Sequence, residues 1–235
     1  MTRPFEASAA QTMDAIVPAA GHGRRLKNKI PKPFISVLGQ PLLVRTLRNL
    51  LRAYPFREMV VMIEKNHLAM ARKVLNRHHL TQVLVAEGGA TRAHSVKKGL
   101  GFLSTKSPWV LIHDGARPLV NRTLVLKTLK AARPTGAALC AVPVTATVKR
   151  VRPGAGQVRA TEDRRSLVLA QTPQIFRKDL LWARYRALGE AAMKATDEAA
   201  LFDGSAVPVG VASGDVRNLK VTTREDLELL KYYLK

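Results

Sequence analysis

A segment of glycines and arginines near the N-terminus combines residue types that hold phosphate groups. Residues 18–25 read Pro-Ala-Ala-Gly-His-Gly-Arg-Arg, and Lys32 follows shortly after them. The apolar run at 15–17 is typical of a buried strand, so its end should present backbone N–H groups as phosphate-binding loops do. The spacing matches neither a dinucleotide fingerprint nor a P-loop. We therefore expect this loop to hold a nucleoside triphosphate for nucleotidyl transfer.

Two later segments place chemically useful side chains after other candidate strands. Residues 87–95 read Glu-Gly-Gly-Ala-Thr-Arg-Ala-His-Ser, and residues 113–118 read His-Asp-Gly-Ala-Arg-Pro. Because ligands bind at the carboxyl ends of strands in α/β sheets, these segments should meet the first loop. Asp114 is the candidate Mg²⁺ ligand, since Mg²⁺ needs only one or two carboxylates beside phosphates. The alternative for Asp114 is a turn cap or an ion pair with Arg117, and His113 is expected to be structural.

Three cations are the candidates for stabilising a reacting phosphate. Displacement at phosphorus builds negative charge on the non-bridging oxygens, and fixed cations counter that charge. Arg25 and Lys32 accompany the first loop, and Lys220 lies in the sequence Asn-Leu-Lys-Val-Thr at 218–222, which we predict to be a short strand. A lysine within an apolar strand needs an anionic partner, so Lys220 is expected to bind phosphate.

Apolar runs alternate with helical patterns along most of the chain. We predict strands at 13–18, 58–63, 82–86, 109–113, 137–143, 206–211 and 217–222. Helical spacing of apolar residues follows at 42–51, 68–75, 96–103, 121–132, 178–188, 196–202 and 223–234. This alternation predicts an α/β fold with a mainly parallel sheet flanked by helices.

One stretch departs from this alternation and predicts a protruding β-arm. Residues 144–166 are polar and contain Pro-Gly-Ala-Gly at 153–156, which favours a hairpin standing away from the sheet. An exposed hairpin is unstable alone, so we expect it to pack against a second subunit in a homodimer. Residues 1–13 are expected to be a loose tail, and residues 14–235 a single domain.

Composition narrows the class of protein. The 235 residues include 39 lysines and arginines but only 17 acidic residues, which gives a net charge of +22. Aromatic residues make up only 5% and no recognition motif is present, which argues against a nucleic-acid partner. An RNA-binding module is kept as the alternative from another class of protein. No apolar run is long enough to span a membrane. The single cysteine, Cys140, fits a reducing, cytoplasmic location.

Eight sequence blocks in order make the chain resemble the 2-C-methyl-D-erythritol 4-phosphate cytidylyltransferases of the non-mevalonate isoprenoid pathway. The blocks lie at 17–25, 31–32, 88–95, 110–118, 143–150, 171–174, 196–199 and 218–222. The resemblance implies a Rossmann-like nucleotidyltransferase fold with a dimerising β-arm. It also implies transfer of a cytidylyl group from CTP to the sugar-alcohol phosphate with Mg²⁺, releasing pyrophosphate. The nearest alternative is a related enzyme that acts on ribitol 5-phosphate or another polyol phosphate.

The same resemblance assigns roles to individual residues. Those implied to stabilise the transition state are Arg25, Lys32 and Lys220. Those implied to bind the nucleotide are Pro18, Ala19, Ala20, Gly21, Gly23, Gly89, Ser95, Asp114 and Gly115, with Asp114 also on the metal. Those implied to bind the acceptor are Arg117, Thr147, Thr172, Thr196 and, from the neighbouring subunit's arm, Arg164. The chain departs from the family at Ala90, where an acidic residue is usual, at Gly115, where alanine is usual, and at Arg217, where the position is often acidic.

Overall fold

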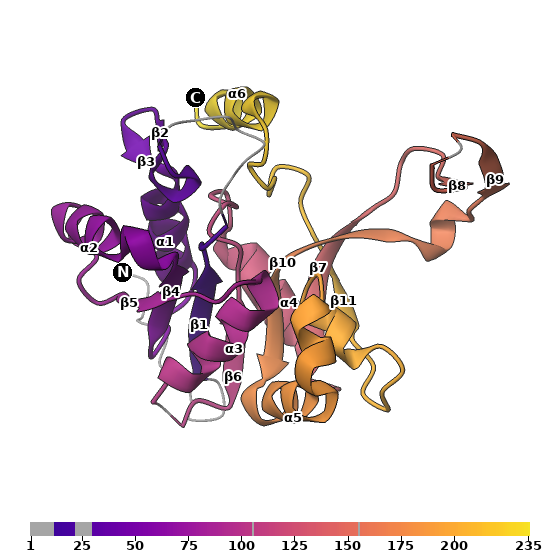
Figure 1. The fold of residues 1–235 in the computed structure, drawn as a ribbon, viewed down its shortest axis with the longest axis horizontal. Coiled ribbons are helices and arrows are strands. Elements are labelled where there is room, and N and C mark those ends of the chain that lie inside the picture. Colours follow the sequence, from indigo (N-terminus) through magenta and orange to yellow (C-terminus); the bar gives the residue numbers. More distant parts are fainter. Residues whose placement is uncertain (1–11, 22–29, 105, 155) are drawn as a thin grey trace, which may run out of the picture.

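A seven-stranded sheet forms the centre of the molecule (Figure 1). The computed structural model describes residues 12–21, 30–104, 106–154 and 156–235. The strand order is β11-β7-β10-β6-β1-β4-β5, and β10 runs antiparallel to both of its neighbours while the other pairs are parallel. The strands are β1 (Met13–Pro18), β4 (Met59–Ile63), β5 (Leu84–Glu87), β6 (Trp109–Ile112), β7 (Ala137–Pro143), β10 (Val168–Arg177) and β11 (Gly210–Ser213).

Helices cover both faces of this sheet. Helices α1 (Leu42–Ala53), α2 (Leu68–Arg77) and α4 (Arg122–Ala132) share one apolar cluster with one side of the strands. Helices α3 (Arg92–Phe102) and α5 (Lys178–Leu188) share a second cluster with the other side. Ala15 and Val17 of β1 belong to the first cluster and Ile16 to the second, which explains why β1 reads as a continuous apolar run.

Smaller elements complete the domain around the edges of the sheet. A short hairpin joins β2 (Ser36–Val37) to β3 (Gln40–Pro41), and α6 (Arg224–Tyr233) packs through Leu230 against Val37 and Leu42. The 3₁₀ helices are η3 (Lys32–Phe34), η4 (Lys65–His67), η5 (Arg164–Ser166), η6 (Gly189–Lys194) and η7 (Ala199–Phe202). In the described part of the chain, no helix has the length and apolar character needed to cross a membrane.

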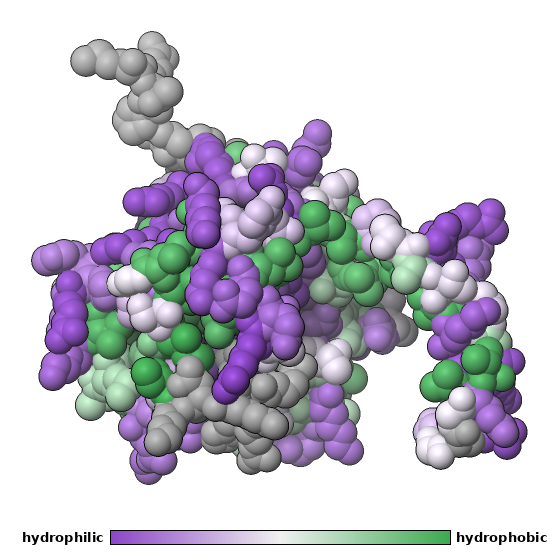
Figure 2. All heavy atoms as spheres, turned by 90° about the horizontal axis from the view of Figure 1, so that it is seen from above, coloured by the Kyte–Doolittle hydropathy of each residue, from purple (hydrophilic) through white to green (hydrophobic). Residues whose placement is uncertain are grey.

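The predicted β-arm is present and stands away from the domain in two perpendicular views (Figures 1 and 2). It carries the two-stranded ribbon of β8 (Lys149–Val151) and β9 (Val158–Thr161), whose residues are all exposed. Figure 2 shows apolar side chains along the arm. The exposed apolar residues of this part of the chain include Val151, Val158 and Leu169. The predicted tail at 1–13 lies mostly outside the described residues, and β1 begins at Met13.

The sequence prediction was right for the first five strands and for helices α5 and α6, but it was wrong for the strands of the C-terminal third. The segment predicted as a strand at 206–211 forms β11 only from Gly210 onward, and residues 217–222 form no strand. The prediction missed β10, which breaks its pairing register between Gln171 and Gln174 at Pro173, a residue that cannot donate to a ladder. The helix expected at 196–202 is the short 3₁₀ helix η7 instead.

Candidate active site

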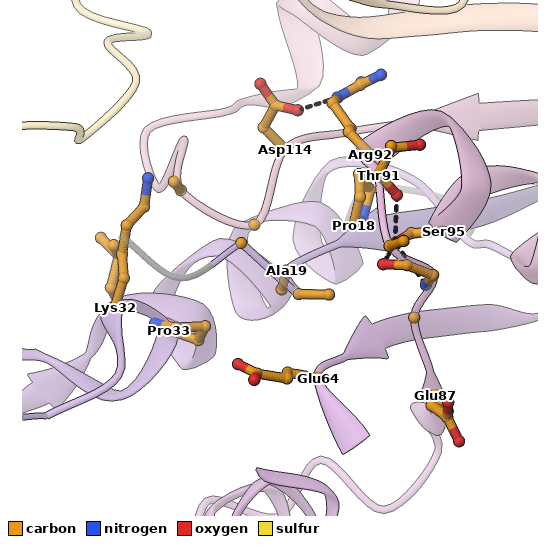
Figure 3. Close-up of a pocket in the computed structure, with 18 of the residues that line it drawn as sticks. Pro18, Ala19, Lys32, Pro33, Glu64, Glu87, Thr91, Arg92, Ser95 and Asp114 are labelled. Carbon is orange, nitrogen blue, oxygen red and sulfur yellow. Dashed lines mark hydrogen bonds and ion pairs between the residues drawn. The ribbon is translucent and has the colours of Figure 1, made fainter. Parts of the chain in front are cut away.

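A cavity of about 630 Å³ opens where β1, β4, β5 and β6 end (Figure 3). It lies at the carboxyl edge of the parallel strands, as the sequence predicted. Its lining includes the predicted residues Pro18, Ala19, Ala20, Gly21, Lys32, Gly89, Ser95, Asp114, Gly115 and Lys220. Figure 3 shows Asp114 and Arg92 at one end of the cavity and Glu64 and Glu87 at the other.

The loop after β5 approaches the loop after β1 at a distance that only glycine allows. A Cβ atom on Gly88 would lie 2.6 Å from the Cβ of Ala20, and one on Gly89 would lie 2.5 Å from Cγ of His94. The Gly89 N–H donates to Oγ of Ser95 at 2.9 Å. Two backbone segments that are distant in sequence therefore form a narrow wall of the cavity.

Asp114 is surrounded by three cations at the end of β6. Its Oδ1 accepts from Nε of Arg92 at 3.0 Å, and its Oδ2 lies 2.9 Å from Nζ of Lys220 and 3.6 Å from Nε of Arg117. Burial alone would raise the pKa of Asp114, but the charges of the three cations outweigh burial and hold that pKa well below its usual range. Asp114 is therefore a fixed carboxylate that positions cations at the edge of the cavity.

The structure differs from the prediction for Lys220 in the secondary structure of its segment and in the anionic group that it contacts. Lys220 lies in a loop between β11 and α6 rather than in a strand, and its anionic partner in the structure is Asp114. The side chain of Lys220 is 39% exposed, so it faces the cavity with room to move. The same loop is held by Val221 N–H donating to the Ala116 carbonyl at 2.9 Å, which keeps Lys220 beside β6.

Arg92 joins Asp114 to Glu198, a connection that the sequence reading missed. Nη1 of Arg92 lies 2.9 and 2.7 Å from the two carboxylate oxygens of Glu198, whose side chain is fully buried. Burial raises the pKa of Glu198, and the charge of Arg92 opposes that shift. The opposite charges raise the pKa of Arg92 although its burial acts against them. Both residues fall within matched sequence blocks, but no sequence signal pairs them across the chain.

A neutral histidine supports Asp114 from behind. Burial lowers the pKa of His113 to about 4, so the ring is uncharged at neutral pH. Nε2 of His113 lies 2.9 Å from the Arg117 carbonyl, which can only accept, so this nitrogen carries the proton. Nδ1 then accepts from Oγ1 of Thr172, and Oγ1 of Thr172 accepts from the Asp114 N–H, both at 3.0 Å. The predicted structural role of His113 agrees with this chain of hydrogen bonds.

The predicted acceptor-binding residues are divided between the cavity region and the arm. Arg117 and Thr172 are buried behind Asp114, and Nη1 of Arg117 donates to the Asn218 carbonyl at 2.7 Å. Thr196 is exposed and lies outside the cavity lining, two positions before Glu198. Thr147 and Arg164 are exposed in the arm, where Nη1 of Arg164 donates to the Thr145 carbonyl at 2.6 Å. Gly23 and Arg25 lie outside the described residues.

The donor set fits a magnesium ion that brings most of its ligands with a triphosphate. No group of three or more histidine, cysteine or acidic side chains in the described ranges could hold a metal by itself. Asp114 is the carboxylate of the cavity lining that contacts Arg92 through one oxygen and Lys220 through the other. Because Mg²⁺ takes one or two carboxylates plus phosphates and water, one carboxylate is sufficient only when a phosphate ligand is present.

Known proteins are similar to this chain in fold and in sequence over almost their whole length. A crystal structure of 4-diphosphocytidyl-2C-methyl-D-erythritol synthase from Anaerococcus prevotii superposes with a TM-score of 0.82 and 31% identity, covering 96% of this chain and 99% of that one. The corresponding structure from Thermus thermophilus gives 0.75 and 30%, covering 94% of this chain and 98% of the other.

Curated sequences give the same result. A 2-C-methyl-D-erythritol 4-phosphate cytidylyltransferase of Syntrophus aciditrophicus is 35% identical over 94% of this chain and 95% of its own length. A bifunctional IspD/IspF enzyme of Desulfotalea psychrophila is 38% identical over 94% of this chain, which spans 56% of that longer relative. The family model for 2-C-methyl-D-erythritol 4-phosphate cytidylyltransferase, IspD, matches residues 13–235, and the chain belongs to that family.

Proposed function

We propose that this protein transfers the cytidylyl group of CTP to 2-C-methyl-D-erythritol 4-phosphate, giving 4-diphosphocytidyl-2-C-methyl-D-erythritol and pyrophosphate for isoprenoid synthesis. The observation that carries the proposal is the cavity itself, which is lined both by Lys32, Lys220 and the Arg92–Asp114 pair and by the Gly88–Gly89 wall. The cationic end suits the phosphates of CTP. The narrow wall formed by the two loops suits the nucleoside.

The reaction needs positioned charge rather than a general base. A phosphate oxygen of the acceptor is already ionised near neutral pH, attacks the α-phosphorus and forms the new P–O bond. The bond from the α-phosphorus to the bridging oxygen breaks, and pyrophosphate leaves with that electron pair. Lys32 and Lys220, with Arg25, stabilise the charge that builds on the non-bridging oxygens. Asp114 holds Lys220 in place before substrate arrives.

Magnesium enters this scheme with CTP. When bound, Mg²⁺ neutralises charge on the triphosphate and orients it, as in other phosphoryl-transfer sites. Asp114 would supply a protein oxygen if Lys220 turned toward the phosphates, which its exposure allows. In an Asp114→Asn variant, the Kd of Mg²⁺·CTP should rise more than the Kd of CTP with EDTA. An equal rise in both constants would remove Asp114 from the metal site.

The acceptor is held by residues from two subunits in this proposal. Arg117 and Thr172 contact Asp114 in one subunit, Thr196 precedes Glu198 by two positions, and Thr147 and Arg164 of the partner subunit would reach the site through its arm. The exposed apolar residues of the arm, including Val158 and Leu169, support packing against a second copy.

Sedimentation should give a dimer at micromolar concentration. An Arg164→Ala subunit mixed with an Arg25→Ala subunit should regain part of the activity, and a monomer or no rescue would contradict the shared site.

The decisive experiment is pyrophosphate release measured with several donors and acceptors. CTP, UTP and ATP are each supplied with Mg²⁺ and with methylerythritol phosphate, and CTP is then tested against ribitol 5-phosphate and other polyol phosphates. The proposal expects CTP and methylerythritol phosphate to give the highest kcat/KM. Comparable turnover of ribitol 5-phosphate would favour the related polyol-phosphate enzyme.

A cytoplasmic location is also part of the proposal, and the free, buried thiol of Cys140 supports it.

A further inference from the structure

The three helices on one face of the sheet carry charge of a single sign. Helices α1, α2 and α4, which we call the basic face, contain nine lysines and arginines and no acidic residue. On the other face, α3 also lacks acidic residues but α5 carries Asp179, and α6 has three acidic residues among its ten. The net charge of +22 is therefore not spread evenly over the helices.

The helices of the basic face lie side by side. Their apolar sides share one core cluster. Nη2 of Arg48 in α1 donates to the His78 carbonyl just after α2 at 3.1 Å, and Nη1 of Arg122 in α4 donates to the Ala53 carbonyl at the end of α1 at 3.3 Å. The order across the face is therefore α2, α1, α4.

Four exposed cations of the basic face form no ion pair with a described residue, whereas some exposed cations elsewhere do. Arg165, Arg177, Arg217 and Lys231 each contact a carboxylate within 3.2 Å. On the basic face, by contrast, a group of exposed side chains forms no ion pair with any residue that the structure describes: Arg52, Arg72, Lys73 and Arg77. Lys106, Arg186, Arg224 and Lys235 are also exposed and form no ion pair with a described residue, so the grouping of such cations on neighbouring helices is what distinguishes the basic face.

This arrangement destabilises the helices unless an anion is bound. Arg48 and Arg52 stand four residues apart in α1, as do Lys73 and Arg77 in α2, and like charges at that spacing repel. Arg122 is the first residue of α4, where the helix dipole is unfavourable to a cation. A polyanion placed across the three helices would offset all of these repulsions.

The residue types on the face select the kind of polyanion. Six of the nine cations are arginines, whose planar guanidinium matches phosphate oxygens in pairs. The three helices contain no aromatic residue, so they offer nothing for unstacked bases of a single strand. Their apolar sides are buried, with Met70 the exposed large apolar side chain, so no apolar stripe is left to enter a bilayer.

From these observations we infer that the basic face docks on the phosphate backbone of a nucleic-acid duplex without reading its bases. This role is separate from the proposed cytidylyl transfer. Leu42, at the start of α1, lines the cavity, and α1 runs from there toward Arg52 at the opposite edge of the sheet. A duplex lying over Arg52, Arg72 and Arg77 therefore leaves the cavity open.

The test compares two variants of the full-length protein that change net charge equally. The face variant combines Arg52→Glu, Arg72→Glu, Lys73→Glu and Arg77→Glu. The control variant combines four exposed cations outside the face, Lys106→Glu, Arg186→Glu, Arg224→Glu and Lys235→Glu. Binding to a 20-base-pair DNA duplex is measured by fluorescence anisotropy over a salt series, beside the single strand of the same length and vesicles containing anionic phospholipid.

The expected result is a loss confined to the face variant. Its affinity for the duplex should fall by roughly 30-fold or more at about 100 mM salt, and the slope of log K against log salt should become shallower by about 3, since each lost phosphate contact removes about 0.9. The control variant should lose less than about 3-fold, and both should keep cytidylyl-transfer activity. Equal losses in the two variants would overturn the inference in favour of general attraction. Tighter binding to the single strand or to vesicles than to the duplex would also overturn it.

Discussion

The cavity and the basic face both concentrate positive charge, but they organise it in opposite ways. Around Asp114 and Glu198, cations and carboxylates interlock at about 3 Å and are largely buried. On the basic face, Arg52, Arg72 and Lys73 are exposed and contact no carboxylate among the described residues. Buried charge must be paired because its desolvation is costly, whereas exposed charge is screened by water and salt. The difference indicates fixed geometry in the cavity and long-range attraction on the face.

The largest expected effect comes from breaking the buried network. Glu198→Gln leaves Arg92 with one buried carboxylate instead of two, and breaking a buried pair typically costs about 3–5 kcal/mol. We expect a loss of this order in the free energy of unfolding, measured with urea. At a temperature where the variant is folded, kcat should fall by about 10-fold with a smaller change in the KM for CTP, because Arg92 no longer holds Asp114 firmly.

Glu228→Gln is the matched control, because Glu228 and Lys231 form an exposed pair of similar length, 2.7 Å. Its removal should change the unfolding free energy by less than about 0.5 kcal/mol. Equal losses for the two variants would show that burial does not distinguish the two regions. An unchanged kcat for Glu198→Gln would reduce Glu198 to a structural role.

The next effect concerns the cations that face the cavity. Lys32→Ala should lower kcat by about 10²–10³-fold, the loss typical when one donor to a developing negative charge is removed. Lys73→Ala on the basic face removes the same charge from an exposed site and should leave kcat within about 2-fold. Steady-state pyrophosphate release measures both. Near-native kcat in Lys32→Ala would remove Lys32 from the transition state.

A pH effect distinguishes the buried histidine from exposed ones. Because the pKa of His113 falls from 6.5 to about 4 on folding, the unfolded chain binds a proton between these values that the folded chain does not. The contribution to stability is complete above pH 6.5 and is lost as pH falls toward 4, a difference on the order of 3 kcal/mol. Asp114 stays ionised throughout this window because its pKa is held below its usual range.

Urea unfolding at several pH values from 7 to 4.5 measures that slope. His113→Gln should flatten the curve relative to the wild type, even if it lowers stability overall. His79→Asn, at an exposed position, should leave the slope unchanged. Flattening of similar size in both variants would show that burial of His113 is not the cause.

The sequence predicted the parts of the fold that repeat and missed the parts that depend on tertiary contacts. Alternation of apolar runs was sufficient to find β1, β4, β5, β6 and β7. It was insufficient for β10, because a proline and a register shift interrupt the pattern there. It also placed Lys220 in a strand, since a short apolar run around a lysine does not distinguish a strand from a loop fixed by Asp114.

In the candidate site, too, local sequence patterns predicted some features, and others depend on tertiary contacts. Loops after buried strands were identified from glycines and charges, and the structure brings most of them to one cavity. The contact between Arg92 and Glu198 joins residues 106 positions apart, so no local pattern could indicate it. The uneven distribution of charge was likewise invisible until the helices were assigned to faces of the sheet.

The smallest expected effect tests whether the basic face repels itself. Lys73→Glu replaces a like-charged pair with Arg77 by an attractive pair at the same spacing, with the acid toward the helix N-terminus. The variant should be more stable by about 0.5 kcal/mol at low salt, and the gain should vanish near 1 M salt, where charges are screened beyond about 3 Å. Lys231→Glu, which breaks the pair with Glu228, should shift stability in the other direction. Adding a carboxylate would then stabilise the face, whereas removing one destabilises the cavity. A Lys73→Glu variant with no gain at low salt would mean that the face is already screened, and the contrast between the two regions would rest on the cavity alone.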